Sequence, residues 1–244
     1  MDEAWGNLAT AAVMHSDWTT GKMAVDKLQA LNSPAYGDAL KLLQSAQTAA
    51  TAVRNDPKAK EAEQFFAKGE ALFKEGEFDK AISAYRQAVK RQPKNANYWC
   101  GLGAAYGRKG ELKDAFNCFS ETVKLDPSHS DGWRNLGVAF KVQGKLREAK
   151  NAAEQATRID PSNALACNDL GVLVMDAGNY QQAVVCFQAA VKNLPSYDLA
   201  WRNLGVALCA LGKDVEARQI LTEMQRRGSP LASEVASALA KTRH

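Results

Sequence analysis

Apolar residues recur along the chain at the spacing of an amphipathic helix, in segments that each end at a glycine. In one such segment, Trp133, Leu136 and Phe140 fall on one helical face ahead of Gly144. Glycine has no β-carbon, so it enters the left-handed conformation of a helix C-terminus at little cost. The pattern therefore predicts a helix that ends at Gly144.

A second apolar stripe follows this glycine and ends at a proline. It contains Leu146, Ala149 and Ala153 and stops at Pro161, because proline cannot continue a helix from within. Together the two segments predict a helix hairpin. Gly137 and Ala149 are expected where the two helices touch, as small spacers rather than active-site residues.

The hairpin pattern repeats with a period of 34 residues. The heptapeptide WRNLGVA stands at 133–139 and again at 201–207, and three series of small residues keep the same step. The series are Gly69, Gly103, Gly137, Gly171 and Gly205; Gly76, Gly110, Gly144, Gly178 and Gly212; and Ala81, Ala115, Ala149, Ala183 and Ala217. The period predicts five units, 62–95, 96–129, 130–163, 164–197 and 198–231, which bury their apolar stripes by stacking.

Residues 1–61 precede the regular units and are also predicted to be helical. Ser33 and Pro34 favour the start of a helix that ends near Asn55. When Trp5 is placed at the fourth position of a unit, the segment contains a degenerate repeat. Generic helices are the other interpretation, and the residues leave both open.

A capping helix is predicted within residues 229–244. Ser229 and Pro230 are typical of an N-cap and a first helical residue, and Leu231, Val235 and Leu239 then share one face. Such a helix covers the exposed stripe at the end of a solenoid. The alternative is that the same stripe packs on another chain.

The recurring positions resemble the tetratricopeptide repeat. The marks are aromatic residues at the fourth place of a unit, leucines at the seventh and prolines at the end: Phe65, Trp99, Trp133 and Trp201; Leu102, Leu136, Leu170 and Leu204; Pro93, Pro127, Pro161 and Pro195. Among the departures, Cys167 replaces the aromatic residue of the fourth unit and Ala153 replaces an aromatic residue of the third. The resemblance implies an all-α, right-handed superhelical solenoid of helix-turn-helix repeats, whose first helices line a concave face that binds an extended segment of another protein.

In this family the groove is lined by the second, fifth, sixth, ninth, twelfth and thirteenth places of each unit. The resemblance therefore implies a partner-binding set in the third to fifth units: Arg134, Asn135, Val138, Lys141, Asn168, Asp169, Val172, Arg202, Asn203 and Val206. The valines would form an apolar floor, while asparagine amides would hold a peptide backbone and arginines would favour carboxylates. A solvated helix face, repeated by recent duplication, is the plainer interpretation.

Two known grooves bear on this set. The asparagines before Leu-Gly, Asn135 and Asn203, are similar to the ladder of O-GlcNAc transferase, from which Asp169 departs; no transferase domain is evident. The carboxylate clamp of heat-shock co-chaperones is not matched, because Val138 and Leu199 stand where it requires asparagine and lysine. A chaperone C-terminus is therefore not the expected ligand.

Composition narrows the function classes. The net charge of +4 is small and its basic residues are interleaved with acids, which argues against a nucleic-acid partner. No apolar run approaches the roughly 20 residues that span a bilayer, and the acidic N-terminus lacks the pattern of a signal peptide, so no membrane insertion and a cytoplasmic location are expected. The cysteines Cys100, Cys118, Cys167, Cys186 and Cys209 lack metal-ligand or disulfide spacing, and are expected to pack as small apolar groups.

No catalytic constellation stands out. The three histidines are scattered, and the glycines follow the 34-residue rhythm rather than a phosphate-binding motif. The sequence predicts a non-catalytic adaptor with no metal and no cofactor, whose partner is another protein. The alternative is a structural subunit of an assembly or homo-oligomer, joined through the solenoid ends and the convex face.

Overall fold

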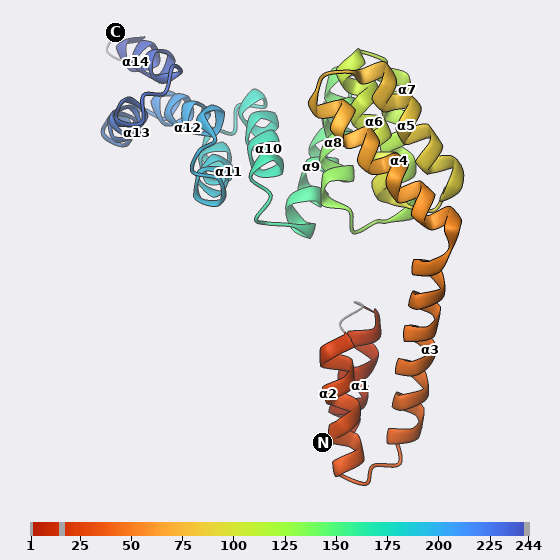
Figure 1. Cartoon of the computed structure of the whole chain (residues 1–244). Helices are drawn as coiled ribbons and strands as arrows, with labels where there is room; N and C mark the ends of the chain where they lie inside the picture. The colour runs from red at the N-terminus through yellow and green to blue at the C-terminus, as the bar shows by residue number, and fades with distance from the viewer. Residues whose placement is uncertain (1, 15–17, 242–244) are drawn as a thin grey trace. The chain divides into compact units, whose positions relative to one another are not determined.

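The computed structural model describes residues 2–14 and 18–241, and its regular elements within these ranges are all helices (Figure 1). In chain order they are α1 (Asp2–Met14), α2 (Trp18–Ala30), α3 (Tyr36–Asn55), α4 (Pro57–Lys74), α5 (Phe78–Arg91), α6 (Ala96–Lys109), α7 (Leu112–Leu125), α8 (Ser130–Val142), α9 (Leu146–Ile159), α10 (Ala164–Asp176), α11 (Tyr180–Asn193), α12 (Asp198–Ala210), α13 (Asp214–Arg226) and α14 (Ala232–Lys241). The chain forms two compact units, one up to Gln64 and one from Phe65 onward.

The first unit is a group of three packed helices. Helices α1 and α2 form a hairpin, and both contact α3. Ala24, Val25, Leu28 and Leu43 are buried between them. The predicted helix after Ser33 is confirmed as α3, and the Ala35 N–H donates to Ser33 Oγ at 3.2 Å just ahead of it.

Helix α4 begins earlier than the expected first repeat, at Pro57 rather than residue 62. Proline suits the first turn of a helix because its missing N–H would have no partner there. The Asp56 carboxylate accepts a hydrogen bond from the Lys58 N–H at 2.9 Å, which satisfies another free donor of that turn. The sequence marks of the repeat thus begin inside a helix that local capping starts upstream.

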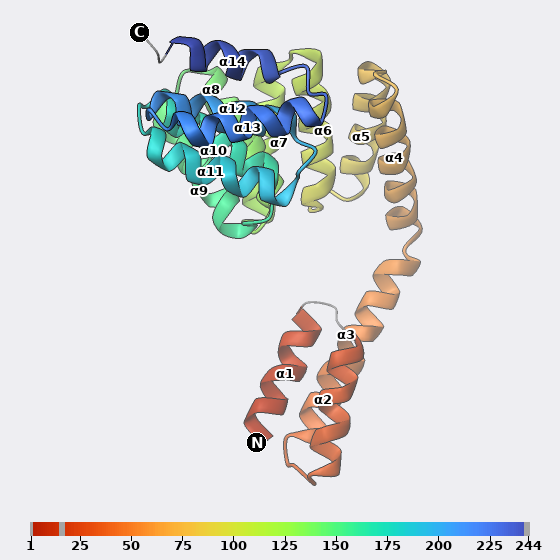
Figure 2. The same ribbon diagram turned by 90° about the vertical axis from the view of Figure 1, so that its left-hand side faces the viewer.

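The second unit is built from consecutive helix hairpins (Figure 2). Each turn contains one of the predicted glycines, and all five of these have positive φ, such as +75° at Gly144. The Lys145 N–H there donates to the Phe140 carbonyl at 3.0 Å, which closes the helix end. The predicted ends of the first helices and the all-α solenoid fold are confirmed, while the five-repeat boundaries stay a prediction.

The first helices of the hairpins form one layer. Helix α8 contacts α6 and α10, and α12 contacts α10 and α14. Among the described residues, no two consecutive second helices, such as α9 and α11, approach each other in this way. Since one layer is more crowded than the other, the stack curves with α6, α8, α10 and α12 on its inner side.

Tryptophan and proline are linked in a way that the sequence alone did not reveal. The indole N–H groups of Trp99, Trp133 and Trp201 donate to the carbonyls of Pro93, Pro127 and Pro195, at 2.8 to 2.9 Å. Cys167 takes the same place with a weak contact from Sγ to the Pro161 carbonyl at 3.6 Å. Each bond ties a first helix to the end of the preceding hairpin.

Helix α14 packs on α12 and α13. Its buried Val235 lies against Gly205, where an added β-carbon would come within 2.7 Å of Val235 Cγ1. Leu239 is also buried. The apolar stripe of this helix is therefore covered within the chain.

Candidate functional site

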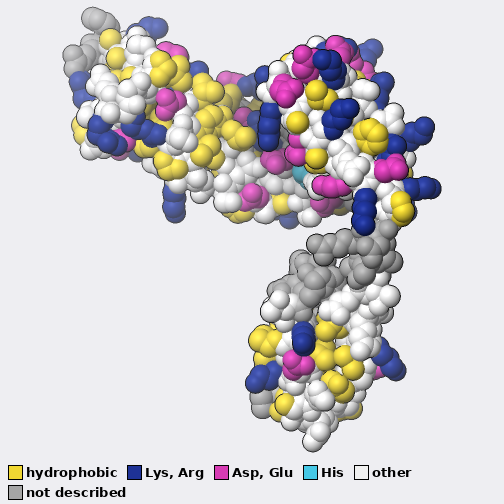
Figure 3. Space-filling view, in the orientation of Figure 1, with side chains coloured by type: hydrophobic (Ala, Val, Ile, Leu, Met, Phe, Trp, Pro, Cys, Tyr) yellow, Lys and Arg dark blue, Asp and Glu magenta, His cyan; other side chains and the backbone are white. Residues whose placement is uncertain are grey.

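The ten predicted site residues lie on three neighbouring first helices of the inner layer. Helix α8 carries Arg134, Asn135, Val138 and Lys141; α10 carries Asn168, Asp169 and Val172; and α12 carries Arg202, Asn203 and Val206. Apolar side chains gather over the part of the second unit that α10, α11 and α12 form (Figure 3). We call the shared surface of α8, α10 and α12 the inner groove.

Ion pairs join α8 to α10 across the inner groove. Arg134 Nε donates to Asp169 Oδ2 at 2.8 Å, and each of these two side chains is 24% exposed. Lys141 Nζ donates to Asp176 Oδ2 at 3.0 Å. The cations of α8 are therefore neutralised by the next helix, which leaves little net charge for an acidic ligand.

The three predicted asparagines make contacts within the protein, and two of them are bonded to each other. Asn203 Nδ2 donates to Asn168 Oδ1 at 2.8 Å, and both residues are only 5% exposed. Asn135 accepts from Arg134 Nη1 at 3.2 Å and makes a weak contact to Cys100 Sγ at 3.7 Å. The prediction that these amides contact a ligand is untested, and the burial of Asn168 and Asn203 counts against it for those two.

Arg202 has an incomplete set of contacts. Its Nε lies 3.4 Å from Glu234 Oε2 of α14, a distance suited to an ion pair. The same nitrogen is buried and makes no hydrogen bond within the described residues. Arg202 is therefore paired with Glu234 by charge alone at this nitrogen, without the hydrogen bond that Arg134 makes to Asp169.

The sequence contained a signal for these partners. Arg134 and Asp169, Lys141 and Asp176, and Asn168 and Asn203 are each 35 residues apart. One repeat plus one residue is the offset that brings side chains of successive first helices face to face. Complementary residues at that offset could have identified Asp176 as a partner, which the predicted set omits.

The inner layer also exposes apolar side chains. Val138 is 42% exposed, Val142 57% and Leu199 44%. A cavity of about 70 Å³ lies among α8, α9 and α10, and Val138 is one of its lining residues. It is lined by Arg134, Gly137, Val138, Lys141, Ala153, Asp169, Val172 and Leu173.

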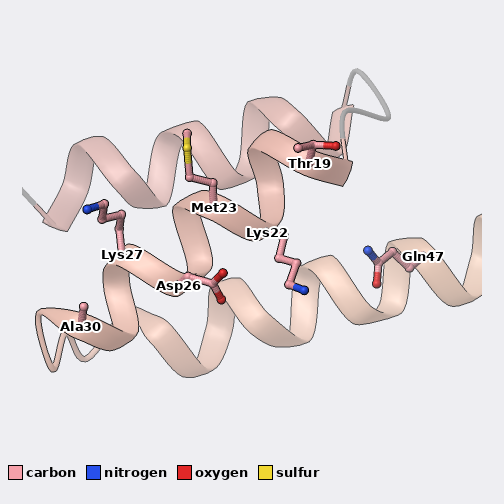
Figure 4. Close-up of a pocket in the computed structure, with 7 residues that line it drawn as sticks. All are labelled: Thr19, Lys22, Met23, Asp26, Lys27, Ala30 and Gln47. Atoms are coloured by element: carbon pink, nitrogen blue, oxygen red, sulfur yellow. The ribbon is translucent and has the colours of Figure 1, made fainter.

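A larger hollow lies in the first unit, on the surface of α2 (Figure 4). Its lining residues are Thr19, Lys22, Met23, Asp26, Lys27 and Ala30 from α2, with Gln47 from α3. The α2 side chains at its centre, including Met23 and Asp26, are exposed. A shallow surface made mostly by one solvated helix face offers no enclosed site.

The cysteine thiols are held in their neutral form. Burial raises the pKa of Cys100 and of Cys186 to about 11, and that of Cys118 to about 12. A raised pKa lowers the thiolate fraction at neutral pH, and the thiolate is the reactive and metal-binding form. Within residues 2–14 and 18–241, no group of three or more His, Cys, Asp and Glu side chains is arranged to hold a metal ion.

The comparison with protein families decides which repeat this is. The family model for the cilia and flagella-associated protein 70 C-terminal domain, a tetratricopeptide repeat model, matches residues 30–241. The chain belongs to this family. No curated protein sequence matches it significantly. The tetratricopeptide repeat predicted from the 34-residue period is therefore confirmed.

Solved structures share the fold of this tetratricopeptide repeat domain. The Pseudomonas aeruginosa pilF structure matches with a TM-score of 0.64 at 18% identity, covering 97% of this chain and 96% of its own. The thermophilic tetratricopeptide repeat protein TTC0263 of Thermus thermophilus matches with a TM-score of 0.59 at 19% identity, over 73% and 99% of the two chains. The structure of YrrB, a tetratricopeptide repeat protein described as having an unusual peptide-binding site, matches with a TM-score of 0.56 at 18% identity. The match covers 77% of this chain and 97% of YrrB. In the part of the chain that is described, no helix is long and apolar enough to cross a membrane.

Proposed function

We propose that this domain is a non-catalytic protein-interaction adaptor whose inner groove binds an extended segment of another protein. The observation that carries the proposal is the exposure of apolar side chains on the inner layer, namely Val138 and Val142 on α8 and Leu199 on α12. Exposed apolar side chains that gather on one face of a solenoid indicate an interaction surface, whereas single scattered ones are common on any protein surface. The same fold carries a peptide-binding site in YrrB.

The charges of the groove indicate the chemistry of the segment. Asp169 neutralises Arg134 and Asp176 neutralises Lys141, so an acidic peptide would have to compete with carboxylates already in place. A segment with apolar side chains gains from Val138 and Val172 without breaking those pairs. The proposed binding requires no metal and no cofactor. We also propose that the domain is cytoplasmic.

A displayed library of random peptides provides a defined test. The best-selected peptide is synthesised, and its affinity is measured by calorimetry for wild type and two variants. Val142→Asp places a charge in the groove, while Val185→Asp does so on α11 at nearly the same exposure, 57% against 58%. We expect Val142→Asp to weaken binding at least tenfold and Val185→Asp to leave it unchanged. The opposite order would refute the groove as the site.

A structural role through the outer surface is the second candidate. The second helices expose Val185 at 58% and Val215 at 71%. If these residues join copies of the chain, sedimentation should show an oligomer that Val185→Asp with Val215→Asp dissolves. A monomer at high concentration would exclude self-assembly through this surface.

A further inference from the structure

In three of the five hairpins of the second unit, a ring from the second helix fills the space beside the glycine of the first helix; the rings are those of Tyr85, Phe119 and Phe187. Phe119 lies against Gly103, where an added β-carbon would meet its ring at 2.7 Å. Phe187 lies against Gly171 in the same way, at 2.5 Å, and is fully buried. The glycine is small because the ring occupies the place of its side chain.

The third hairpin has no such ring. Ala153 stands at the aromatic place of α9, and α9 approaches α8 closely instead. A β-carbon on Gly137 would meet the Ala149 carbonyl oxygen of the backbone at 3.2 Å. Yet the closer approach does not fill the space, because the cavity of about 70 Å³ is lined by Ala153 and Gly137 together.

The cavity is lined by apolar and polar side chains. Val138, Val172 and Leu173 join Ala153 and Gly137 in its walls, and Arg134, Lys141 and Asp169 complete its lining. Arg134 is paired with Asp169 and Lys141 with Asp176. Because both cations have a carboxylate partner, the cavity does not favour an anionic ligand. Val138 is 42% exposed, which places the opening on the inner groove.

Size restricts the guest. One water needs about 10–15 Å³ of such space, whereas a dry cavity of about 150 Å³ takes benzene. A cavity of about 70 Å³ is too large for one water and small for an aromatic ring. A branched aliphatic side chain lies between these limits and suits the apolar part of the lining, which includes Val138, Val172 and Leu173.

We propose that this cavity is a specificity subsite that takes one valine, isoleucine or leucine side chain of the bound segment. The inference rests on the proposed function, since the segment must lie in the inner groove. Its backbone passes over the mouth, while one aliphatic side chain occupies the place that a phenyl ring fills in neighbouring hairpins. The alanine that stands in place of a ring in the third hairpin is thus the residue that creates the subsite.

The test fills the cavity from inside. Peptides selected from the random display library on wild type are expected to share one Val, Ile or Leu position. Ala153→Leu should weaken binding of the synthesised peptide about 10- to 100-fold, the effect of losing one buried aliphatic side chain. Replacing that peptide residue by alanine should cost wild type the same factor and cost Ala153→Leu little. Ala153→Val is the smaller filler if leucine prevents folding.

Two outcomes distinguish a failure of the proposed subsite from a failure of the proposed peptide-binding function. A peptide that loses affinity with Val142→Asp but binds Ala153→Leu and Ala153→Val as well as wild type would overturn the subsite and leave the groove intact. Peptides insensitive to Val142→Asp, or no enrichment at all, would overturn the groove and the subsite together.

Xenon provides a readout that is independent of any peptide. Under xenon pressure, methyl resonances of Val138, Val172 and Leu173 should shift in wild type and not in Ala153→Leu. Unchanged wild-type resonances would show that the cavity admits no apolar guest, which would overturn the subsite.

Discussion

The buried hydrogen bond between the Asn168 and Asn203 amides should stabilise the packing of α10 on α12. Asn203→Ala removes the donor of the 2.8 Å bond and leaves the Asn168 carbonyl oxygen without that partner at 5% exposure. A neutral hydrogen bond contributes about 1 kcal/mol net, and an unsatisfied buried polar group costs about 1–3 kcal/mol. We therefore expect Asn203→Ala to lower the free energy of unfolding by about 2 kcal/mol.

A double-mutant cycle distinguishes this role from a ligand contact. Urea unfolding, followed by circular dichroism, is measured for wild type, Asn168→Ala, Asn203→Ala and the double variant. Removing the second amide should cost less than the first, with a coupling energy of about 1 kcal/mol, because the bond is already lost. Unchanged midpoints for the single variants, or strictly additive effects, would refute a structural role for the pair.

Three further predictions concern the second unit. Phe187→Ala should cost about 3–5 kcal/mol by opening a cavity against Gly171; a thermal unfolding midpoint equal to that of wild type would contradict the packing. Arg134→Ala should cost about 1 kcal/mol, given a half-buried pair, with most of the loss recovered by adding Asp169→Asn; urea unfolding in which the second change brings no recovery would count against the pair. Burial raises the pKa of the Cys118 thiol to about 12, so its contribution to stability is complete below the ordinary value near 9 and is lost as the pH rises from there toward 12; the urea midpoint should fall over that range in wild type and fall less in Cys118→Ala.

The repeat architecture was predictable because its determinants are local. The glycine at each turn sets a positive φ, and the small residue at Gly137 meets Ala149 as the sequence predicted. These features need only the hairpin itself. Helix α4 shows the limit, since its start at Pro57 follows from a local cap outside the repeat period.

The inner groove was harder to predict because its polar residues interact between units. The pattern placed Arg134, Asn168 and Asn203 on one face, and the structure places them there, but two of the three are buried against partners. A 34-residue alignment compares equivalent places and hides the 35-residue offset between partners. The cavity at Ala153 was not predicted for another reason, since it depends on the absence of a packed ring from the third hairpin.

The most direct test of the groove locates the bound segment on the protein. Wild type carrying ¹³C-labelled valine methyl groups is titrated with the selected peptide, and the methyl shifts are followed. Shifts confined to Val138, Val142, Val172 and Val206 are predicted, because these residues lie on α8, α10 and α12. Shifts at Val185 and Val215 with no change at the four groove valines would contradict the account, and would place the interaction on the outer surface.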